Sequence, residues 1–349
     1  MPDLSPSLEA SLARYPRVPL TRLPTPLQRL DTLSARLGLN VFMKRDDLTD
    51  LTFGGDKPRK LEYELAAAIA NGADTLVTSG AAQSNHARLT TAAARRLGLD
   101  CVVVLSNDER HDFQGNLLTV YLMGARVEII DTEDHWDLEE HTLRICRELE
   151  AEGRHPHHIP VSGTTPLSCL GYVQAGLEIA DQLDEIGVRL DAVYSPFGTG
   201  GIFTSVLFAL RQLRIEAAMI GISVNRSVEM CRANITEWWT SNSELLDVDP
   251  ETDKGAHDVT DEFIGAGYGD PTPAALDAII DVAQAEGILL DPVYSGKMAA
   301  GFFAHAAEGR WEPDSNILLI HSGGSPALFA YRDPLAAHLR DRGILPPLS

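Results

Sequence analysis

The stretch Phe53-Gly54-Gly55-Asp56-Lys57-Pro58-Arg59-Lys60-Leu61-Glu62 places a glycine turn directly before a predicted helix. Two adjacent glycines allow a sharp turn and a close approach of the backbone to a ligand. We predict that Asp56 caps the helix and that Pro58 occupies its first turn. Lys57 is then held at the helix start, with Lys60 one turn further on, where an amine can meet a carbonyl or phosphate group. An ordinary loop before a solvated basic helix start is the alternative.

The length and composition indicate a soluble protein. A chain of 349 residues can form two lobes and bury a sizeable core. No apolar run reaches membrane-spanning length, and no secretory signal precedes the chain's first elements. The four cysteines, which are Cys101, Cys146, Cys169 and Cys231, lack the CxxC spacing of zinc sites. We therefore expect reduced thiols in a cytoplasmic protein.

The charge balance excludes two classes of partner. The formal net charge is −21, and only five residues are lysines. Such a surface repels nucleic acid and anionic membranes, so we expect neither as a partner.

Beyond Lys57, predicted strands alternate with predicted helices. The strands are expected near 75–79, 101–105, 127–130, 158–161, 192–195, 218–224 and 316–320. Helices are expected near 57–71, 85–97, 116–123, 138–152, 170–183 and 273–286, and the acidic segment 226–270 is expected to be irregular. This alternation is typical of an α/β protein with parallel sheets and helices on their faces.

Four loops follow predicted strands, which is where α/β proteins bind ligands. Gln83-Ser84-Asn85-His86 opens a helix, where free N–H groups can bind a carboxylate or phosphate, or where Ser84 is simply a cap. Gly198-Thr199-Gly200-Gly201 lacks dinucleotide and Walker spacing. It offers a nest of N–H groups for one phosphate, or else a tight turn.

The other two loops carry hydroxyl groups. Tyr294, within Asp291-Pro292-Val293-Tyr294-Ser295-Gly296-Lys297, could act as an acid or base, or could be a half-buried aromatic with a satisfied hydroxyl. The fourth loop is His321-Ser322-Gly323-Gly324-Ser325. A turn lysine, a phosphate nest, an anion loop and a hydroxyl loop together predict pyridoxal 5'-phosphate as the cofactor. The histidines at 155, 157 and 158 match no familiar zinc pattern, so we predict no metal site.

Five motifs in order resemble the D-cysteine desulfhydrase and 1-aminocyclopropane-1-carboxylate deaminase family. They lie at 54–62, 83–86, 265–269, 290–297 and 321–324, and the resemblance extends from about residue 16 to 331. It implies a two-lobed tryptophan-synthase-β-like fold (fold type II), a small amino-acid substrate and a homodimer. Residues 1–57 plus 165–349 would form the large cofactor-binding domain, and 58–164 an inserted small domain.

The same resemblance implies roles for individual residues. Lys57 would bind the cofactor covalently, Asn85 would lie beside its ring hydroxyl, and Ser322 would meet its pyridine nitrogen. The phosphate would be bound by Lys60 and by the backbone of the loop formed by Gly198, Thr199, Gly200 and Gly201. The substrate would be contacted by Ser84, Asn85, His86, Tyr268 and Tyr294, of which Ser84, Tyr268 and Tyr294 would join Lys57 in catalysis. A hydroxyl at Ser322 does not keep the ring nitrogen protonated, which suits prompt loss of a β-leaving group.

Two positions favour one branch of that family. Ser295 and Ser325 stand where the cyclopropane deaminases typically carry Glu and Leu. The sequence therefore predicts a D-cysteine desulfhydrase, which converts D-cysteine and water to sulfide, ammonia and pyruvate. The alternatives are L-cysteate sulfo-lyase, for which Arg88 is the available arginine, deamination of D-serine or 3-chloro-D-alanine, and the cyclopropane deaminase. A catalytically silent binding protein of the same fold is a further alternative.

Three positions depart from the family pattern. Asp56 replaces Asn, Ile202 replaces Thr, and Thr165 ends a Ser-Gly-Thr-Thr loop that replaces a Gly-Gly-Ser-Asn type of loop. Losing a hydroxyl at a buried phosphate costs about 1–3 kcal/mol. We therefore expect weakened cofactor binding.

The acidic, lysine-poor composition is compatible with a salt-loving source, because salt screens the repulsion between like charges. We expect the midpoint of thermal unfolding to be higher in ~1 M potassium chloride, where the Debye length is about 3 Å, than in dilute buffer. Equal midpoints at both salt concentrations would contradict this interpretation.

Overall fold

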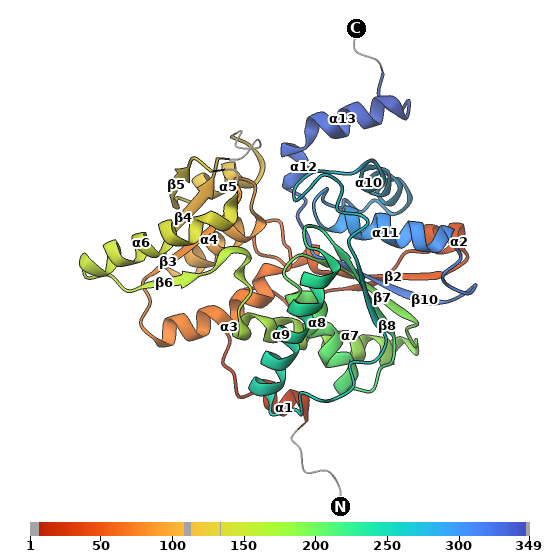
Figure 1. Ribbon diagram of the computed structural model, residues 1–349, viewed down its shortest axis with the longest axis horizontal. Coiled ribbons are helices and arrows are strands. Elements are labelled where there is room, and N and C mark those ends of the chain that lie inside the picture. Colours follow the sequence, from red (N-terminus) through yellow and green to blue (C-terminus); the bar gives the residue numbers. More distant parts are fainter. Residues whose placement is uncertain (1–6, 108–112, 133, 347–349) are drawn as a thin grey trace, which may run out of the picture.

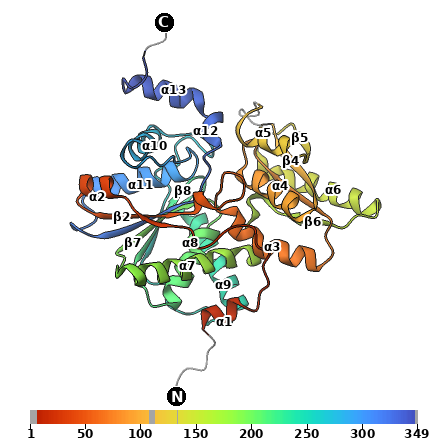
Figure 2. The ribbon, with the colours of Figure 1, turned by 180° about the vertical axis from the view of Figure 1, so that it is seen from behind.

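The computed structural model describes residues 7–107, 113–132 and 134–346. The outermost residues of the predicted large domain, 1–6 and 347–349, lie outside these ranges. Within them the chain forms two sheets, which lie in separate lobes (Figures 1 and 2).

The larger sheet has six strands in the order β1-β2-β10-β7-β8-β9. β1 pairs antiparallel with β2, and the other pairs are parallel. The strands are β1 (Leu27–Arg29), β2 (Asn40–Arg45), β7 (Ala192–Phe197), β8 (Ala218–Ser223), β9 (His257–Thr260) and β10 (Asn316–His321).

The smaller sheet has four parallel strands in the order β5-β4-β3-β6. They are β3 (Thr75–Gly80), β4 (Asp100–Ser106), β5 (Arg126–Ile130) and β6 (Pro156–Ile159). All four lie between residues 58 and 164. The domain boundaries at 57/58 and 164/165 nevertheless stay a proposal, which this separation of the sheets supports.

Helices cover both faces of each sheet, as expected for parallel strands that are apolar on both sides. In the large lobe, one face packs against α1 (Leu8–Leu12), α7 (Pro166–Ile186), α8 (Gly201–Gln212) and α9 (Val228–Leu246), and the other against α2 (Asp31–Leu37), α10 (Pro273–Glu286) and α11 (Ser295–Ala307). In the small lobe, one face packs against α3 (Lys57–Ala70), α4 (Asn85–Leu97) and α5 (Gly115–Leu122), and the other against α6 (Glu139–Ala151). The predicted α/β class is confirmed.

Short elements complete the fold. They are the 3-10 turns η1 (Asp46–Leu48), η2 (His135–Leu138) and η3 (Val161–Gly163), and the C-terminal helices α12 (Ala327–Ala330) and α13 (Arg332–Asp341). None of the described helices is both long and apolar enough to cross a membrane.

The expectation of an irregular segment at 226–270 was wrong. It contains the 19-residue helix α9 and the edge strand β9. Ser227 caps α9 by accepting a hydrogen bond from the Met230 backbone, and the buried Trp239 packs edge-on against Phe208 of α8. The apolar side chains of α9 are widely spaced among polar ones, so burial against α8 rather than local periodicity makes this helix stable. The predicted strand at 158–161 lies two residues too late, because Val161 already begins η3.

A buried ion cluster joins α3 to the large lobe. Arg59 on α3 donates to both carboxylate oxygens of Asp46 at 2.9 Å and to Glu178 of α7 at 2.9 and 3.0 Å. Lys44 of β2 donates to the same Glu178 at 2.5 Å. Burial alone would raise the pKa of the Asp46 carboxyl, but Arg59 holds it below its usual value. Two cations thus face two carboxylates in the interior, and loss of one partner of such a pair costs about 3–5 kcal/mol.

The helices α3 and α7 are in direct backbone contact at Gly171. A Cβ on Gly171 of α7 would lie 2.2 Å from the Arg59 carbonyl oxygen, so only glycine allows this approach. The start of α3, and with it Lys57, is therefore fixed against the large sheet.

Candidate active site

The four predicted loops converge on one pocket. Three of them follow β3, β7 and β10, as expected for α/β sheets, whereas the loop that bears Tyr294 lies between α10 and α11, so the strand expected before it is wrong. The pocket, including its opening to solvent, has a volume of about 830 Å³, which is within the range of small-molecule sites. Its lining includes each predicted site residue, namely Lys57, Lys60, Ser84, Asn85, His86, Gly198, Thr199, Gly200, Gly201, Tyr268, Tyr294 and Ser322. The roles of these residues remain proposals.

Asp56 does not cap α3, contrary to the sequence prediction. It occupies the N-cap position, but its backbone is helical and its side chain accepts no hydrogen bond from the helix N–H groups. Its buried carboxylate instead lies 2.6 Å from Lys57 Nζ. The Asp56 backbone N–H donates to the Ser322 carbonyl at 2.9 Å, which fixes the position of the residue. In this position its carboxylate accepts from Lys57 Nζ and not from the helix N–H groups. The carboxylate that departs from the family pattern is therefore matched by the lysine amine.

Arg88 supports the backbone of the glycine turn at Gly54-Gly55 and does not line the pocket. Its guanidinium donates to the carbonyls of Thr52 and of Gly54, the latter at 3.1 Å, and to Asn116 Oδ1 at 2.7 Å. Burial lowers the pKa of Arg88 to about 10. The idea that Arg88 could serve a sulfonate substrate is therefore wrong, because the backbone of the turn that leads to Lys57 already uses its donors.

Lys60, a residue of α3, is a buried cation that lies beside the N-terminus of α8. Its only hydrogen-bond partner in the described part of the chain is Thr164 Oγ1, at 3.1 Å. Burial, reinforced by the positive charge of Lys57, lowers the pKa of Lys60 to about 8. A Cβ on Gly201, the first residue of α8, would lie 3.4 Å from Lys60 Nζ. The ammonium and the free N–H groups of the helix terminus thus face the same small space, which suits a phosphate.

The helix missed by the sequence prediction fixes the phosphate loop. Asn234 and Trp238, both on α9, donate to the carbonyl oxygen of Thr199 at 3.0 and 2.8 Å. With this carbonyl directed toward α9, the loop's N–H groups are left to face the pocket. Nothing in the local sequence of the Gly198–Gly201 loop indicates these two donors.

The two predicted tyrosines form a pair. Their hydroxyl oxygens are 2.6 Å apart, and their rings meet edge-on with centroids 6.1 Å apart. Burial, together with the neighbouring Tyr268, raises the pKa of Tyr294 well above its ordinary value. The Tyr294 hydroxyl therefore stays protonated and can donate.

Two buried residues that sequence reasoning passed over hold the tyrosines. The Asp291 carboxylate accepts from the backbone N–H of Tyr294 at 2.9 Å and from the Ser295 hydroxyl at 2.6 Å. Lys297, two residues further on, donates to the carbonyls of Ile264 and Gly267, at 2.6 and 3.0 Å, in the loop that bears Tyr268. The sequence placed both residues in a motif but gave no signal of these contacts.

The anion loop keeps its helix-cap geometry while facing the pocket. Ser84 Oγ accepts from the Ala87 N–H at 3.1 Å, so the cap interpretation is correct and compatible with a ligand role. Asn85 accepts from Asn116 at 2.8 Å, and His86 Nε2 lies 2.8 Å from Thr78 Oγ1. Burial, then the charges of Lys57 and Lys60, lower the pKa of His86 well below its ordinary value, so its ring is neutral. If His86 contacts a carboxylate as predicted, its backbone N–H rather than its ring would be the donor.

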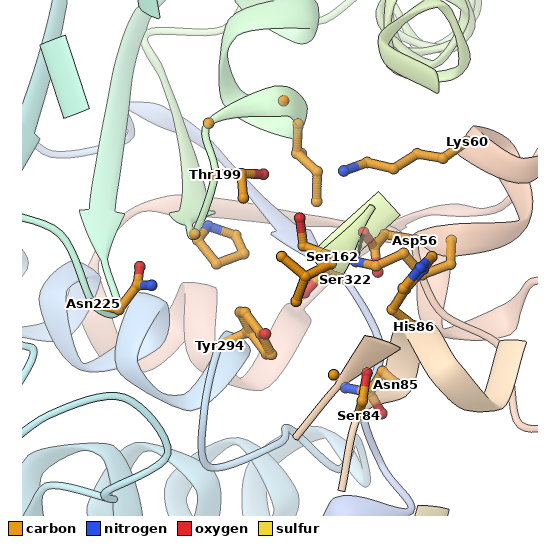
Figure 3. Close-up of a pocket in the computed structure, with 18 of the residues that line it drawn as sticks. Asp56, Lys60, Ser84, Asn85, His86, Ser162, Thr199, Asn225, Tyr294 and Ser322 are labelled. Atoms are coloured by element: carbon orange, nitrogen blue, oxygen red, sulfur yellow. Dashed lines mark hydrogen bonds and ion pairs between the residues drawn. The ribbon is translucent and has the colours of Figure 1, made fainter. Parts of the chain in front are cut away.

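Figure 3 shows how these groups face one another across the pocket. Lys60 and Thr199 point toward each other from opposite sides, and Tyr294 and Ser322 lie between Asn225 and His86. Asn225, which follows β8 and was not predicted, has its buried Oδ1 without a hydrogen-bond partner among the described residues.

The residues present fit pyridoxal 5'-phosphate. Lys57 supplies an amine, and the buried Lys60 with the glycine-rich start of α8 supplies a cradle for a dianion. The Ser322 hydroxyl and the orphaned Asn225 oxygen supply polar groups for the rest of the molecule. No group of three or more His, Cys, Asp or Glu side chains in the described ranges is arranged to hold a metal ion.

Most of the chain is similar to known proteins. A family model described as pyridoxal-phosphate dependent enzyme matches residues 18–323. The D-cysteine desulfhydrase of Serratia proteamaculans is 40% identical over 333 residues, which are 93% of this chain and 98% of that protein. The D-cysteine desulfhydrase of Klebsiella pneumoniae is 41% identical over 332 residues, 93% and 99% of the two chains.

Solved structures agree with this match. A crystal structure described as an ACC deaminase homologue has a TM-score of 0.88 and 38% identity, covering 96% of this chain and all of that one. A fungal L-serine ammonia-lyase from Rhizomucor miehei has a TM-score of 0.68 at 19% identity, covering 91% and 98% of the chains, and supports the fold alone.

The depressed pKa of Lys60 predicts a pH dependence of phosphate binding. The ammonium is present below pH 8 and is lost as the pH rises through about 8, while a phosphate monoester stays dianionic above pH ~6. The affinity of the apo-protein for pyridoxine 5'-phosphate, which has no aldehyde to react with Lys57, should be constant near neutrality. Above pH 8 it should fall by up to about tenfold per pH unit.

Isothermal titration calorimetry between pH 6.5 and 10 measures this dependence. Lys60→Met should bind weakly at every pH, whereas Lys254→Met, a lysine outside the pocket, should behave as the wild type. A pH-independent affinity of the wild type would show that the Lys60 charge does not bind phosphate.

Proposed function

The chain belongs to the family of pyridoxal-phosphate dependent enzymes, and we propose that it is a D-cysteine desulfhydrase. The reaction would convert D-cysteine and water to sulfide, ammonia and pyruvate. The observation that carries the proposal is the 40% identity to D-cysteine desulfhydrases over 93% of the chain. The pocket supports it, because it holds an amine, a phosphate cradle and a proton-donating tyrosine pair in one space.

The reaction needs a base at the substrate Cα and an acid at its sulfur. The bound cofactor withdraws electrons from Cα and so makes its proton removable. Lys57 Nζ would take that proton, and the Asp56 carboxylate at 2.6 Å would stabilise the ammonium that results. Of the two hydroxyl protons of the tyrosine pair, one lies in the bond between Tyr268 and Tyr294. We infer that Tyr268 donates within this bond, so that the Tyr294 proton would be donated to the departing sulfur.

The pocket bears on the alternative substrates. A sulfonate leaving group requires an extra cation, but the described pocket lining contains no arginine, and its lysines are Lys57 and Lys60. This disfavours L-cysteate. Ser295, which pointed away from the cyclopropane deaminases, is fully buried against Asp291 and does not line the pocket. Its role is therefore to hold the Tyr294 loop. A silent binding protein would not need to keep the amine and the tyrosine pair together.

A substrate panel tests the assignment. With D-cysteine, L-cysteine, L-cysteate, D-serine, 3-chloro-D-alanine and 1-aminocyclopropane-1-carboxylate, we expect sulfide and pyruvate from D-cysteine at the highest kcat/KM. Lys57→Ala should abolish turnover, since the proposed base at Cα is removed, while Lys254→Met should retain it. If the yellow holoenzyme prefers another substrate of the panel, D-cysteine desulfhydrase is the wrong name for it.

Removal of one hydroxyl of the tyrosine pair tests the acid. Tyr294→Phe should lower kcat by about 10²–10⁴, because the proton for the leaving sulfur is lost. The loss should be smaller for 3-chloro-D-alanine, whose chloride leaves without a proton. Tyr63→Phe, a buried tyrosine outside the pocket, is the control. An equal loss on both substrates would contradict the acid role.

We also propose that the protein is a homodimer, as the resemblance implied, and that the second copy covers the end of the molecule formed by α5, α10, α12 and α13. An apolar groove there is lined by residues such as Ile280, Leu289, Phe329 and Leu339. Phe329 is 67% exposed, and α13 has no buried residue. An exposed apolar groove of this kind is typical of an interaction surface, and a second copy of the chain is the partner that we propose.

Light scattering tests this assembly. The wild type should have twice the mass of one chain, and Phe329→Glu with Leu339→Glu should yield monomers that still bind the cofactor. Ile186→Glu, an exposed apolar residue of α7, is the control. A monomeric wild type would contradict the proposal. A cytoplasmic location, which cell fractionation would establish, is supported by the four buried free cysteines.

A further inference from the structure

Thr164 stands between the side chains of Lys60 and Thr199, two residues that were predicted to bind the phosphate, Thr199 through its backbone. Its hydroxyl oxygen is 3.1 Å from Lys60 Nζ and 2.7 Å from Thr199 Oγ1. These contacts join residues that are 104 and 35 positions apart in the sequence. Both partners line the pocket, but Thr164 does not. It therefore lies behind them, and no assignment made from the sequence includes it.

The chemistry of Lys60, Thr164 and Thr199 determines which of them donates each hydrogen bond. The Lys60 ammonium can only donate, so the Thr164 oxygen accepts from it. Thr164 can then donate its own hydrogen to Thr199 Oγ1, and a hydroxyl that accepts from a cation becomes a stronger donor. Thr199 in turn accepts, and its hydrogen has no partner among the described residues. That hydrogen is free for an acceptor in the pocket.

The surrounding backbone holds Thr164 in this position. Ser162 and Gly163 both have positive φ, at 70° and 66°, and a Cβ on Gly163 would lie 2.5 Å from the His86 ring. Immediately afterwards, Thr165 caps α7 in a reciprocal capping box with Ser168. The strained corner and the helix cap fix the residue between them from both sides. The Ser-Gly-Thr-Thr loop, which departs from the family pattern, thus places the Thr164 hydroxyl between Lys60 and Thr199.

The first turn of α8 explains why an oriented hydroxyl is needed. Ile202, its second residue, lines the pocket, and its side chain offers no hydrogen bond. The Thr199 carbonyl accepts hydrogen bonds from Asn234 and Trp238, which fixes the backbone of the loop. The Thr199 hydroxyl can still rotate, so its orientation must be set by another group. If that hydroxyl pointed its lone pairs at a phosphate, it would repel the dianion.

We propose that Thr164 is a positioning residue of the phosphate site. It accepts a hydrogen bond from Lys60 and donates one to Thr199, so that the Thr199 hydroxyl donates its own hydrogen to the phosphate of the cofactor. The inference rests on the cofactor and not on the identity of the amino-acid substrate. It can therefore fail while the proposed reaction stands, and the reverse is also true.

Cofactor binding by the apo-protein tests the relay. Thr164→Val keeps the shape of the side chain but removes both bonds, and should raise the Kd for pyridoxal 5'-phosphate about tenfold. Thr164→Ser, which restores the hydroxyl, should stay within about threefold of the wild type. Pyridoxal, which has the aldehyde but no phosphate, should bind the valine variant and the wild type equally.

The phosphorus NMR signal of the bound cofactor provides a second readout that a merely structural role would not move. It should shift in Thr164→Val and return toward the wild-type position in Thr164→Ser. Thr164→Ala gives the same comparisons if the valine variant does not fold. An unchanged Kd for pyridoxal 5'-phosphate, or an equal loss of affinity for pyridoxal, would overturn the proposal.

Discussion

The buried ion cluster around Arg59 is the constraint on which the active site depends. α3 carries two pocket-lining lysines at its start, and its third residue, Arg59, forms ion pairs with Asp46 and Glu178 in the core of the large lobe. Because these charges are removed from water, displacing the helix would leave them unpaired at a cost of several kcal/mol. Lys57 is thus presented by a rigid helix start, and its Nζ can be placed against a ligand without a loop having to be ordered.

Several other contacts serve the same purpose around the pocket. Arg88 fixes the glycine turn, α9 fixes the phosphate loop, and Asp291 and Lys297 fix the two tyrosines. Each support is a buried or half-buried polar group that bonds to backbone. A backbone contact sets the position of a loop without depending on the side chain that meets the ligand. The groups that meet the ligand can therefore differ from the family pattern, as Asp56 and Ile202 do, while the pocket keeps its shape.

Sequence reasoning succeeded where the signal is local. The alternation of strands and helices from residue 57 onward, and the loops at the strand ends, follow from periodicity and glycine turns, which adjacent residues decide. It failed for α9, which owes its stability to packing on α8. It failed also for Asp56, whose type suits a cap but whose neighbour Lys57 offers a stronger partner. In both cases a tertiary or electrostatic interaction outweighed a local propensity.

By itself, the sequence determined the α/β class, the cofactor and twelve of the residues that line the pocket, because the motifs that carry them are short and contiguous. Only the tertiary structure decided which groups support them. Thr164 meets Lys60 and Thr199 across 104 and 35 residues of chain, and Arg88 reaches Gly54 across 34. Hydrogen bonds of this kind depend on how the two lobes and their loops are packed, and no pattern of neighbouring residues specifies that packing.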